Sequence, residues 1–207
     1  SVYDIRIKPG ILFQPHPAFA VDEKGRHRYL SLTRAQLGAR RSPSDFEHQG
    51  TRELTADDFV YALKRHATTR IEAPVFAVFA EYVIGLKAYA EQIKAEDAKL
   101  LAPLPTDIRD KPFLDFRQWP LEGATALARY TFRLRLKGKY PQMSYWMAMP
   151  FFAPIPWEAD AFYAQEGMSA NGLSLNQWPV GTGPYMMTTF ERDRLHVMKR
   201  NPNYRGE

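Results

Sequence analysis

The sequence predicts a mixed α+β fold. Two segments alternate polar and apolar residues in the manner of half-buried strands, Val2–Lys8 near the start and Arg129–Lys137 further along. Between them, apolar residues in the segment 56–66 recur with the spacing of one helix face. A third pattern, two short β-type runs separated by a polar turn, occupies residues 185–200. Strands at both ends of a chain with helical segments between them favour the α+β class.

The first strand places Tyr3, Ile5 and Ile7 on one face and charged residues on the other, so that one side is buried. Pro9 and Gly10 are expected to turn the chain. Extended structure should then resume over residues 11–13.

Residues 14–52 are predicted to form a long loop, rich in histidine, proline, arginine and serine. A loop of this length inside a compact domain usually has a function or wraps the surface.

A helix is expected to begin after Thr55, which is a favourable N-cap residue. Asp58 stands at the third helical position, where its carboxylate can complete a capping box, and acidic residues also suit the positive end of the helix. The apolar stripe that follows consists of Phe59, Ala62 and Leu63, with His66 at its edge.

Two further helices are predicted over Ala73–Leu86 and Lys87–Leu101, separated near Gly85. Residues 106–119 are expected to be mostly loop. The segment 123–127 should pair with the strand Arg129–Lys137 across a turn.

The rest of the chain is predicted to alternate short elements. A helix over residues 140–147 should precede an apolar strand, Pro150–Pro156, and then a helix, Trp157–Gln165. The polar loop 167–177 leads to the final hairpin, whose strands are Tyr185–Phe190 and Leu195–Arg200.

The stretch Pro179–Tyr185 reads Pro-Val-Gly-Thr-Gly-Pro-Tyr. Gly181 and Gly183 permit backbone angles that other residues resist, and Pro184 fixes its own φ, which together predict a tight bend into the hairpin. A phosphate cradle is not expected, because such a loop ends in Gly-Lys-Ser/Thr and leads into a helix, whereas Pro184 and a strand-like run follow here.

Composition is typical of a globular protein, with 45% hydrophobic and 25% charged residues among 207. The net charge of +5 does not predict nucleic-acid binding, because the basic residues are scattered among 23 acidic ones. No apolar run is long enough to span a membrane. The absence of cysteine excludes disulfides and cysteine nucleophiles.

No metal or catalytic site is predicted. The histidines lack the helical pairing of a metal site; they are His16, His27, His48, His66 and His196. The serines considered as nucleophiles lack Gly-x-Ser-x-Gly surroundings; they are Ser44, Ser144 and Ser169. The adjacent Asp57 and Asp58 are explained by helix capping.

Four ordered motifs resemble those of the family 5 extracellular solute-binding proteins, the receptors of ABC importers for peptides, nickel and related solutes. They are the strand ending in Lys-Pro-Gly-Ile-x-Phe at 8–13, the Leu-Thr-Ala-Asp helix at 54–57, the Tyr-Thr strand at 130–131, and the stretch 179–185 followed by Asn-Pro-x-Tyr-x-Gly at 201–206. The long segment 14–52 departs from the commonest family pattern.

The resemblance implies the first-lobe portion of a two-lobed, periplasmic-binding-protein-like fold. Residues 1–8 would belong to the main lobe, residues 9–155 would form a variable subdomain with the insertion 14–52, and residues 156–207 would return to strands of the main lobe. The second lobe would lie outside this chain.

The function implied by the resemblance is capture of an oligopeptide-like solute between two lobes and its delivery to a membrane permease. The protein would be periplasmic, or extracellular and associated with the membrane. The chain would be a monomer with no cofactor, no enzymatic activity and no nucleic-acid partner. In relatives the segment after the Thr-Ala-Asp helix approaches the ligand, which selects Val75 and Phe76. A hydrolase domain acting on peptides or glycans, and an interaction module that uses the inserted loop, are the alternatives.

Overall fold

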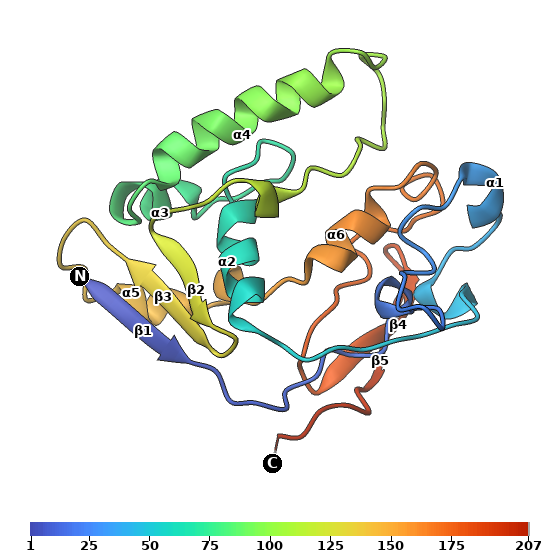
Figure 1. Cartoon of the computed structure of the whole chain (residues 1–207). Helices are drawn as coiled ribbons and strands as arrows, with labels where there is room; N and C mark the ends of the chain where they lie inside the picture. The colour runs from blue at the N-terminus through green and yellow to red at the C-terminus, as the bar shows by residue number, and fades with distance from the viewer. Residues whose placement is uncertain (207) are drawn as a thin grey trace. The chain divides into compact units, whose positions relative to one another are not determined.

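The structure, a computed structural model, describes residues 1–206, which form two compact units (Figure 1). Unit 1 contains Ser1–Pro9, Thr55–Pro103 and Asp115–Ile155. Unit 2 contains residues 10–54, 104–114 and 156–206. Each unit contains both helices and strands, so the mixed α+β class is confirmed.

A three-stranded antiparallel sheet, ordered β1-β3-β2, organises unit 1. Its strands are β1 (Val2–Arg6), β2 (Ala124–Ala128) and β3 (Thr131–Arg135). In the register, Ile5 of β1 is opposite Phe132 of β3, and Phe132 and Leu134 are almost completely buried. The predicted alternation of both strands is therefore confirmed, although each strand is shorter than expected: β1 ends at Arg6, and β3 begins only after a turn at 129–130.

The helices of unit 1 include α2 (Ala56–Arg65), which packs on β2 and β3 and places the ring of Phe59 6.0 Å from that of Phe132. Thr55 is its N-cap, and the Asp58 carboxylate accepts a hydrogen bond from the Thr55 backbone N–H (2.8 Å), as predicted. The other helical elements are α3 (Phe76–Tyr82), α4 (Leu86–Leu101), α5 (Met143–Met147), and the 3-10 turns η3 (Phe116–Gln118) and η4 (Pro150–Phe152). Within residues 1–206, no helix combines the length and apolar character needed to cross a membrane.

The helix predicted over Ala73–Leu86 is wrong in extent, since only Phe76–Tyr82 is helical. After Tyr82 the backbone pairs with the end of β3, because Val83 bridges Leu136 and the Ile84 N–H donates to the Arg135 carbonyl (3.1 Å). Gly85 then adopts a left-handed conformation (φ 76°), which lets the chain turn directly into α4.

The apolar strand predicted over Pro150–Pro156 is also wrong. The segment begins as the 3-10 turn η4 and continues without regular structure. Its three prolines, Pro150, Pro154 and Pro156, have no N–H to donate to a sheet, and the fixed φ of Pro150 suits the first position of a helical turn.

Unit 2 is built from the predicted insertion, helix α6 (Trp157–Tyr163) and the final hairpin. The insertion 14–52 is largely irregular, as predicted, but contains short helical turns: η1 (Pro17–Phe19), α1 (Arg34–Leu37) and η2 (Pro43–Asp45). It packs on α6 through η1 and through Phe46, whose ring lies 5.1 Å from that of Phe162.

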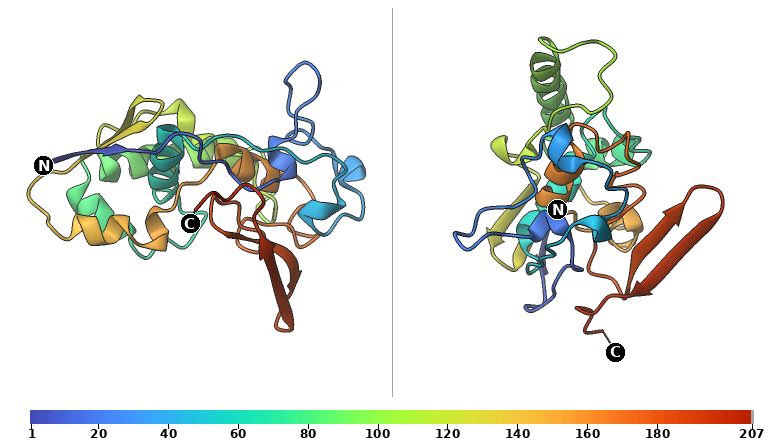
Figure 2. Two further views of the ribbon diagram at one scale, coloured as in Figure 1. Left: turned by 90° about the horizontal axis from the view of Figure 1, so that it is seen from below. Right: turned by 90° about the vertical axis from the view of Figure 1, so that its right-hand side faces the viewer.

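The predicted hairpin is confirmed as the antiparallel pair β4 (Tyr185–Glu191) and β5 (Leu195–Arg200), with a bulge between Met187 and Thr189. Asp193, in the turn, has the positive φ (57°) that a tight hairpin turn requires. Figure 2 shows the two strands as a ribbon that extends away from η1 and α6 of the same unit.

Candidate functional site

Val75 and Phe76, the residues predicted to approach a ligand, lie at the start of α3 in unit 1. Val75 is 4% exposed, and its carbonyl accepts a hydrogen bond from the Phe79 N–H (3.0 Å). Phe76 is half-buried. Of the two side chains, only that of Phe76 has surface available to an external molecule, so a ligand role for the pair stays a prediction that depends mainly on Phe76.

One turn further along α3, Phe79 is the centre of an aromatic cluster. It is completely buried, and three rings meet it edge to face: His66 at 5.6 Å, Phe152 at 6.0 Å and Trp146 at 6.2 Å. Because these rings come from the C-cap of α2, from η4 and from α5, the cluster fixes α3 against the rest of unit 1. Edge-to-face contacts of this kind add to the stabilisation from burial, by about 0.5–1.5 kcal/mol each.

His66 is held in its neutral form within this cluster. Its Nε2–H donates to the Phe151 carbonyl oxygen (2.8 Å), which leaves Nδ1 as the unprotonated nitrogen. Nδ1 is buried, and no described residue hydrogen-bonds to it. Burial lowers the pKa of His66, so the ring contributes apolar contact at neutral pH.

The surface beside the cluster is apolar and only slightly concave. Phe59, Ala62, Leu63, Phe151 and Phe152 line a shallow hollow. Of these residues, Phe151 is the most exposed, at 38%. Such a surface can contact an apolar or aromatic group, but it offers no set of converging polar atoms for a reaction.

In unit 2, the two stretches that carry the strongest sequence signal lie side by side. The side chain of Asn201 is almost fully buried and donates to the Gly183 carbonyl (2.9 Å), while its backbone N–H donates to the Pro184 carbonyl (2.8 Å). The Asn201 side-chain oxygen also accepts from the Asn203 N–H (3.0 Å). These bonds close the base of the β4–β5 hairpin.

The predicted bend at 181–184 is present, but it does not use unusual backbone angles, since neither Gly181 nor Gly183 is among the positive-φ glycines. The stretch leads into β4. A helix N-terminus, which a phosphate cradle requires, therefore does not follow it.

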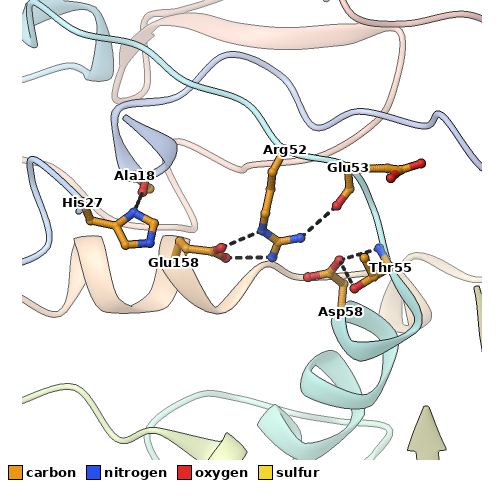
Figure 3. Close-up of polar contacts among 7 residues, drawn as sticks. All are labelled: Ala18, His27, Arg52, Glu53, Thr55, Asp58 and Glu158. Carbon is orange, nitrogen blue, oxygen red and sulfur yellow. Dashed lines mark hydrogen bonds and ion pairs between the residues drawn. The ribbon is translucent and has the colours of Figure 1, made fainter. Parts of the chain in front are cut away.

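Arg52 and Glu158 form the most buried ion pair of unit 2 that involves the insertion (Figure 3). The guanidinium Nε and Nη2 atoms donate to the two carboxylate oxygens at 2.6 and 2.7 Å. The Arg52 guanidinium also lies over the rings of Phe13 (5.1 Å) and Phe19 (5.5 Å). The Glu158 side chain is 5% exposed and that of Arg52 28%, so the pair is a structural tie between the insertion and α6.

The histidines are dispersed rather than gathered. In the part of the chain that the structure describes, no group of three or more acidic or histidine side chains could hold a metal ion. His16 contacts Tyr163, His27 contacts the Ala18 carbonyl (Figure 3), and His196 stacks on Phe190. No local sequence pattern marks the Arg52–Glu158 and His16–Tyr163 contacts, because their partners are 106 and 147 residues apart.

Comparison with solved structures gives similarities of low identity. The chain is 17% identical to an oligopeptide ABC transporter substrate-binding domain from Bacillus anthracis str. Ames (TM-score 0.48), covering 72% of this chain and 23% of that one. It is 15% identical to Listeria monocytogenes OppA bound to peptide (TM-score 0.48; 73% and 24% covered). It is 17% identical to Helicobacter pylori DppA in complex with the peptide STSA (TM-score 0.48; 100% and 28% covered).

The chain thus spans about a quarter of the length of each of these proteins. No curated protein sequence matches it. A sequence profile does match, over residues 48–207, and its description is "Bacterial extracellular solute-binding proteins, family 5 Middle". The match includes the Thr-Ala-Asp helix α2, β3 and the complete hairpin. The chain therefore belongs to the family 5 bacterial extracellular solute-binding proteins.

Proposed function

We propose that this chain is part of the substrate-binding component of an ABC importer, which captures an oligopeptide-like solute between two lobes and presents it to a membrane permease. The observation that carries this proposal is the family match over residues 48–207. The family description is extracellular, and the periplasm is the compartment we propose. The role is binding without turnover, with no cofactor, by a monomer.

The proposal that the solute is a peptide comes from similar proteins. Listeria monocytogenes OppA is described as bound to peptide and Helicobacter pylori DppA as bound to the peptide STSA. The half-buried ring of Phe76, next to the aromatic cluster around Phe79, is a suitable contact for the apolar parts of a peptide. The buried Val75 would help hold Phe76 in position through its packing inside unit 1.

In this proposal the chain supplies part of one lobe. The assignment of residues 1–8 and 156–207 to a main lobe, and of residues 9–155 to a variable subdomain, stays a prediction about the larger protein. Closure of two lobes on a solute would draw its free energy from contacts that the solute makes with both.

The test uses the protein expressed from its complete coding sequence and purified gently. Native mass spectrometry should detect bound peptides, and calorimetric titration with a peptide recovered from them should give stoichiometric binding. Phe76→Ala should weaken that binding at least tenfold, since an aromatic contact is lost. Phe113→Ala, which removes another half-buried phenylalanine but from unit 2, is the matched control and should leave it unchanged.

A protein that carries no peptide, and binds none from a peptide digest, would contradict the peptide assignment. A protein that cleaves the digest catalytically would favour the hydrolase alternative instead. If the Phe76→Ala variant and the wild type bind the peptide with equal affinity, only the role of Phe76 in binding is rejected, and the peptide assignment stands.

A further inference from the structure

His16 is the centre of a hydrogen-bond relay in unit 2. Its ring is 1% exposed and enclosed by the rings of Phe19, Phe162 and Tyr163. Its Nδ1 accepts the backbone N–H of Ala18 (3.1 Å), and its Nε2 is 2.9 Å from the Tyr163 hydroxyl oxygen. The Tyr163 hydroxyl in turn donates to the Trp178 carbonyl (2.9 Å).

This relay admits one protonation state. The Tyr163 hydroxyl has a single proton, which it donates in its hydrogen bond to the Trp178 carbonyl. The hydroxyl oxygen must therefore accept a hydrogen bond from His16 Nε2–H. Nδ1 must then be unprotonated, since it accepts a hydrogen bond from the Ala18 backbone N–H. A second proton, on Nδ1, would face the Ala18 N–H donor and would have no acceptor.

The relay joins two segments that are far apart in sequence. Next to His16, Gln14 pairs with Gly181 twice: its backbone N–H donates to the Gly181 carbonyl (2.9 Å), and its side-chain oxygen accepts the Gly181 N–H (3.1 Å). On the other side, the His16 backbone is bridged to Gly50. The start of the insertion is therefore tied to the segment 178–181 at two points, directly from Gln14 to Gly181 and through Tyr163 from His16 to Trp178.

We propose that His16 is an acid-sensitive latch, which holds residues 13–20, where the insertion begins, against the segment 178–181 and releases them when its imidazole takes up a second proton. The proposal concerns this unit alone and does not depend on the identity of the solute.

The direction of the pH dependence follows from burial. Burial lowers the pKa of His16 from 6.5 to about 3, with no charged group contributing. The charged and titratable groups on the surrounding elements are Arg52, Glu158, Asp160, Tyr163 and His27, and the first two are paired with each other. A released His16 would regain its ordinary pKa, so the ratio of latched to released protein should fall about tenfold per pH unit from about 6.5 down to about 3.

Peptide-resolved hydrogen exchange of the full-length protein tests this proposal, with each rate divided by its intrinsic chemical rate at the same pH. Protection of residues 13–20, which include the Ala18 amide, should fall about 70-fold between pH 6 and pH 4. Protection of β3 residues 131–135, which lie in unit 1, should fall by much less over that interval. The variant His16→Gln, which cannot titrate, should show no such fall.

His27→Gln is the matched control, because His27 lies in the same insertion and contacts the Ala18 carbonyl (3.2 Å), but a second proton on its ring leaves that bond intact. This variant should keep the wild-type pH dependence. The latch is overturned if the protection of 13–20 follows that of β3, if His16→Gln keeps the fall, or if His27→Gln abolishes it.

If His16→Gln does not fold, NMR of histidine-labelled wild-type protein decides. The latch requires a neutral Nε2–H ring at pH 7 and a separate protonated set of signals that grows as protection of 13–20 is lost. A single His16 signal that titrates near pH 6.5 with unchanged protection would overturn it.

Discussion

Replacing Arg52 with methionine should destabilise unit 2 far more than removal of an exposed charge does. The variant leaves the Glu158 carboxylate, whose side chain is 5% exposed, without the two short bonds from the guanidinium. Breaking a buried pair from one side typically costs about 3–5 kcal/mol of unfolding free energy. Methionine keeps the contact with the rings of Phe13 and Phe19, so most of the loss would come from the unpaired charge.

The pair is asymmetric, and this asymmetry gives the sharper test. Glu158→Gln should cost less, about 1–3 kcal/mol, because the Arg52 side chain is 28% exposed and its guanidinium can turn toward water. The double variant Arg52→Met with Glu158→Leu removes both charges, and its stability should return to within about 2 kcal/mol of the wild type.

Urea unfolding of the full-length protein, followed by circular dichroism and by tryptophan fluorescence, gives the free energies of unfolding of the wild type and the three variants. Asp4→Asn, which breaks the exposed Arg133–Asp4 pair, is the control and should produce no measurable change. The reasoning fails if Arg52→Met is no more destabilising than Glu158→Gln, or if the double variant is the least stable of the four.

Three further changes have defined outcomes. Phe79→Ala should destabilise unit 1 by about 3–5 kcal/mol in urea unfolding, since it empties the centre of the aromatic cluster, whereas Phe151→Ala, at the exposed rim, should have a much smaller effect. Asn201→Ala should cost about 1–3 kcal/mol and increase hydrogen exchange at the base of the hairpin, because the Gly183 carbonyl loses its donor; unchanged exchange there would contradict this role. Since burial lowers the pKa of His66, its neutral form stabilises the fold above the unfolded-state pKa, and stability should decline as the pH falls below about 6.5; the His66→Gln variant should lack this part of the decline.

Local patterns predicted the elements that depend on local interactions. The N-cap at Thr55 with the carboxylate of Asp58, the alternation of β3 and the final hairpin all follow from residues within a few positions of one another. The two wrong predictions occur where a distant pairing partner or a missing N–H donor determines the local structure. Val83 leaves the helix because it pairs with Leu136, and the segment 150–156 cannot be a strand because prolines interrupt its donors.

The candidate ligand contact was only partly accessible to sequence reasoning. The resemblance selected Val75 and Phe76, but the burial of one and the exposure of the other depend on how α3 packs on Phe152 and Trp146. Those contacts join residues about 70 positions apart, a separation at which periodicity carries no information. The sequence therefore predicts the family and the segment, while the structure distinguishes between the two side chains.

The insertion has a structural role that its composition does not indicate. A surface loop tolerates change because its backbone groups bond to water, yet Gln14 both donates to and accepts from Gly181. The Phe13 carbonyl accepts from the Asn203 side chain (2.7 Å) and from the Thr51 hydroxyl (2.6 Å). An isolated two-stranded hairpin is at best marginally stable, so the base of β4–β5 needs such partners. The start and end of the insertion supply them, at Gln14 and at Thr51. The segment that departs most from the commonest family pattern is thus the one that holds the signature stretches of unit 2 in place.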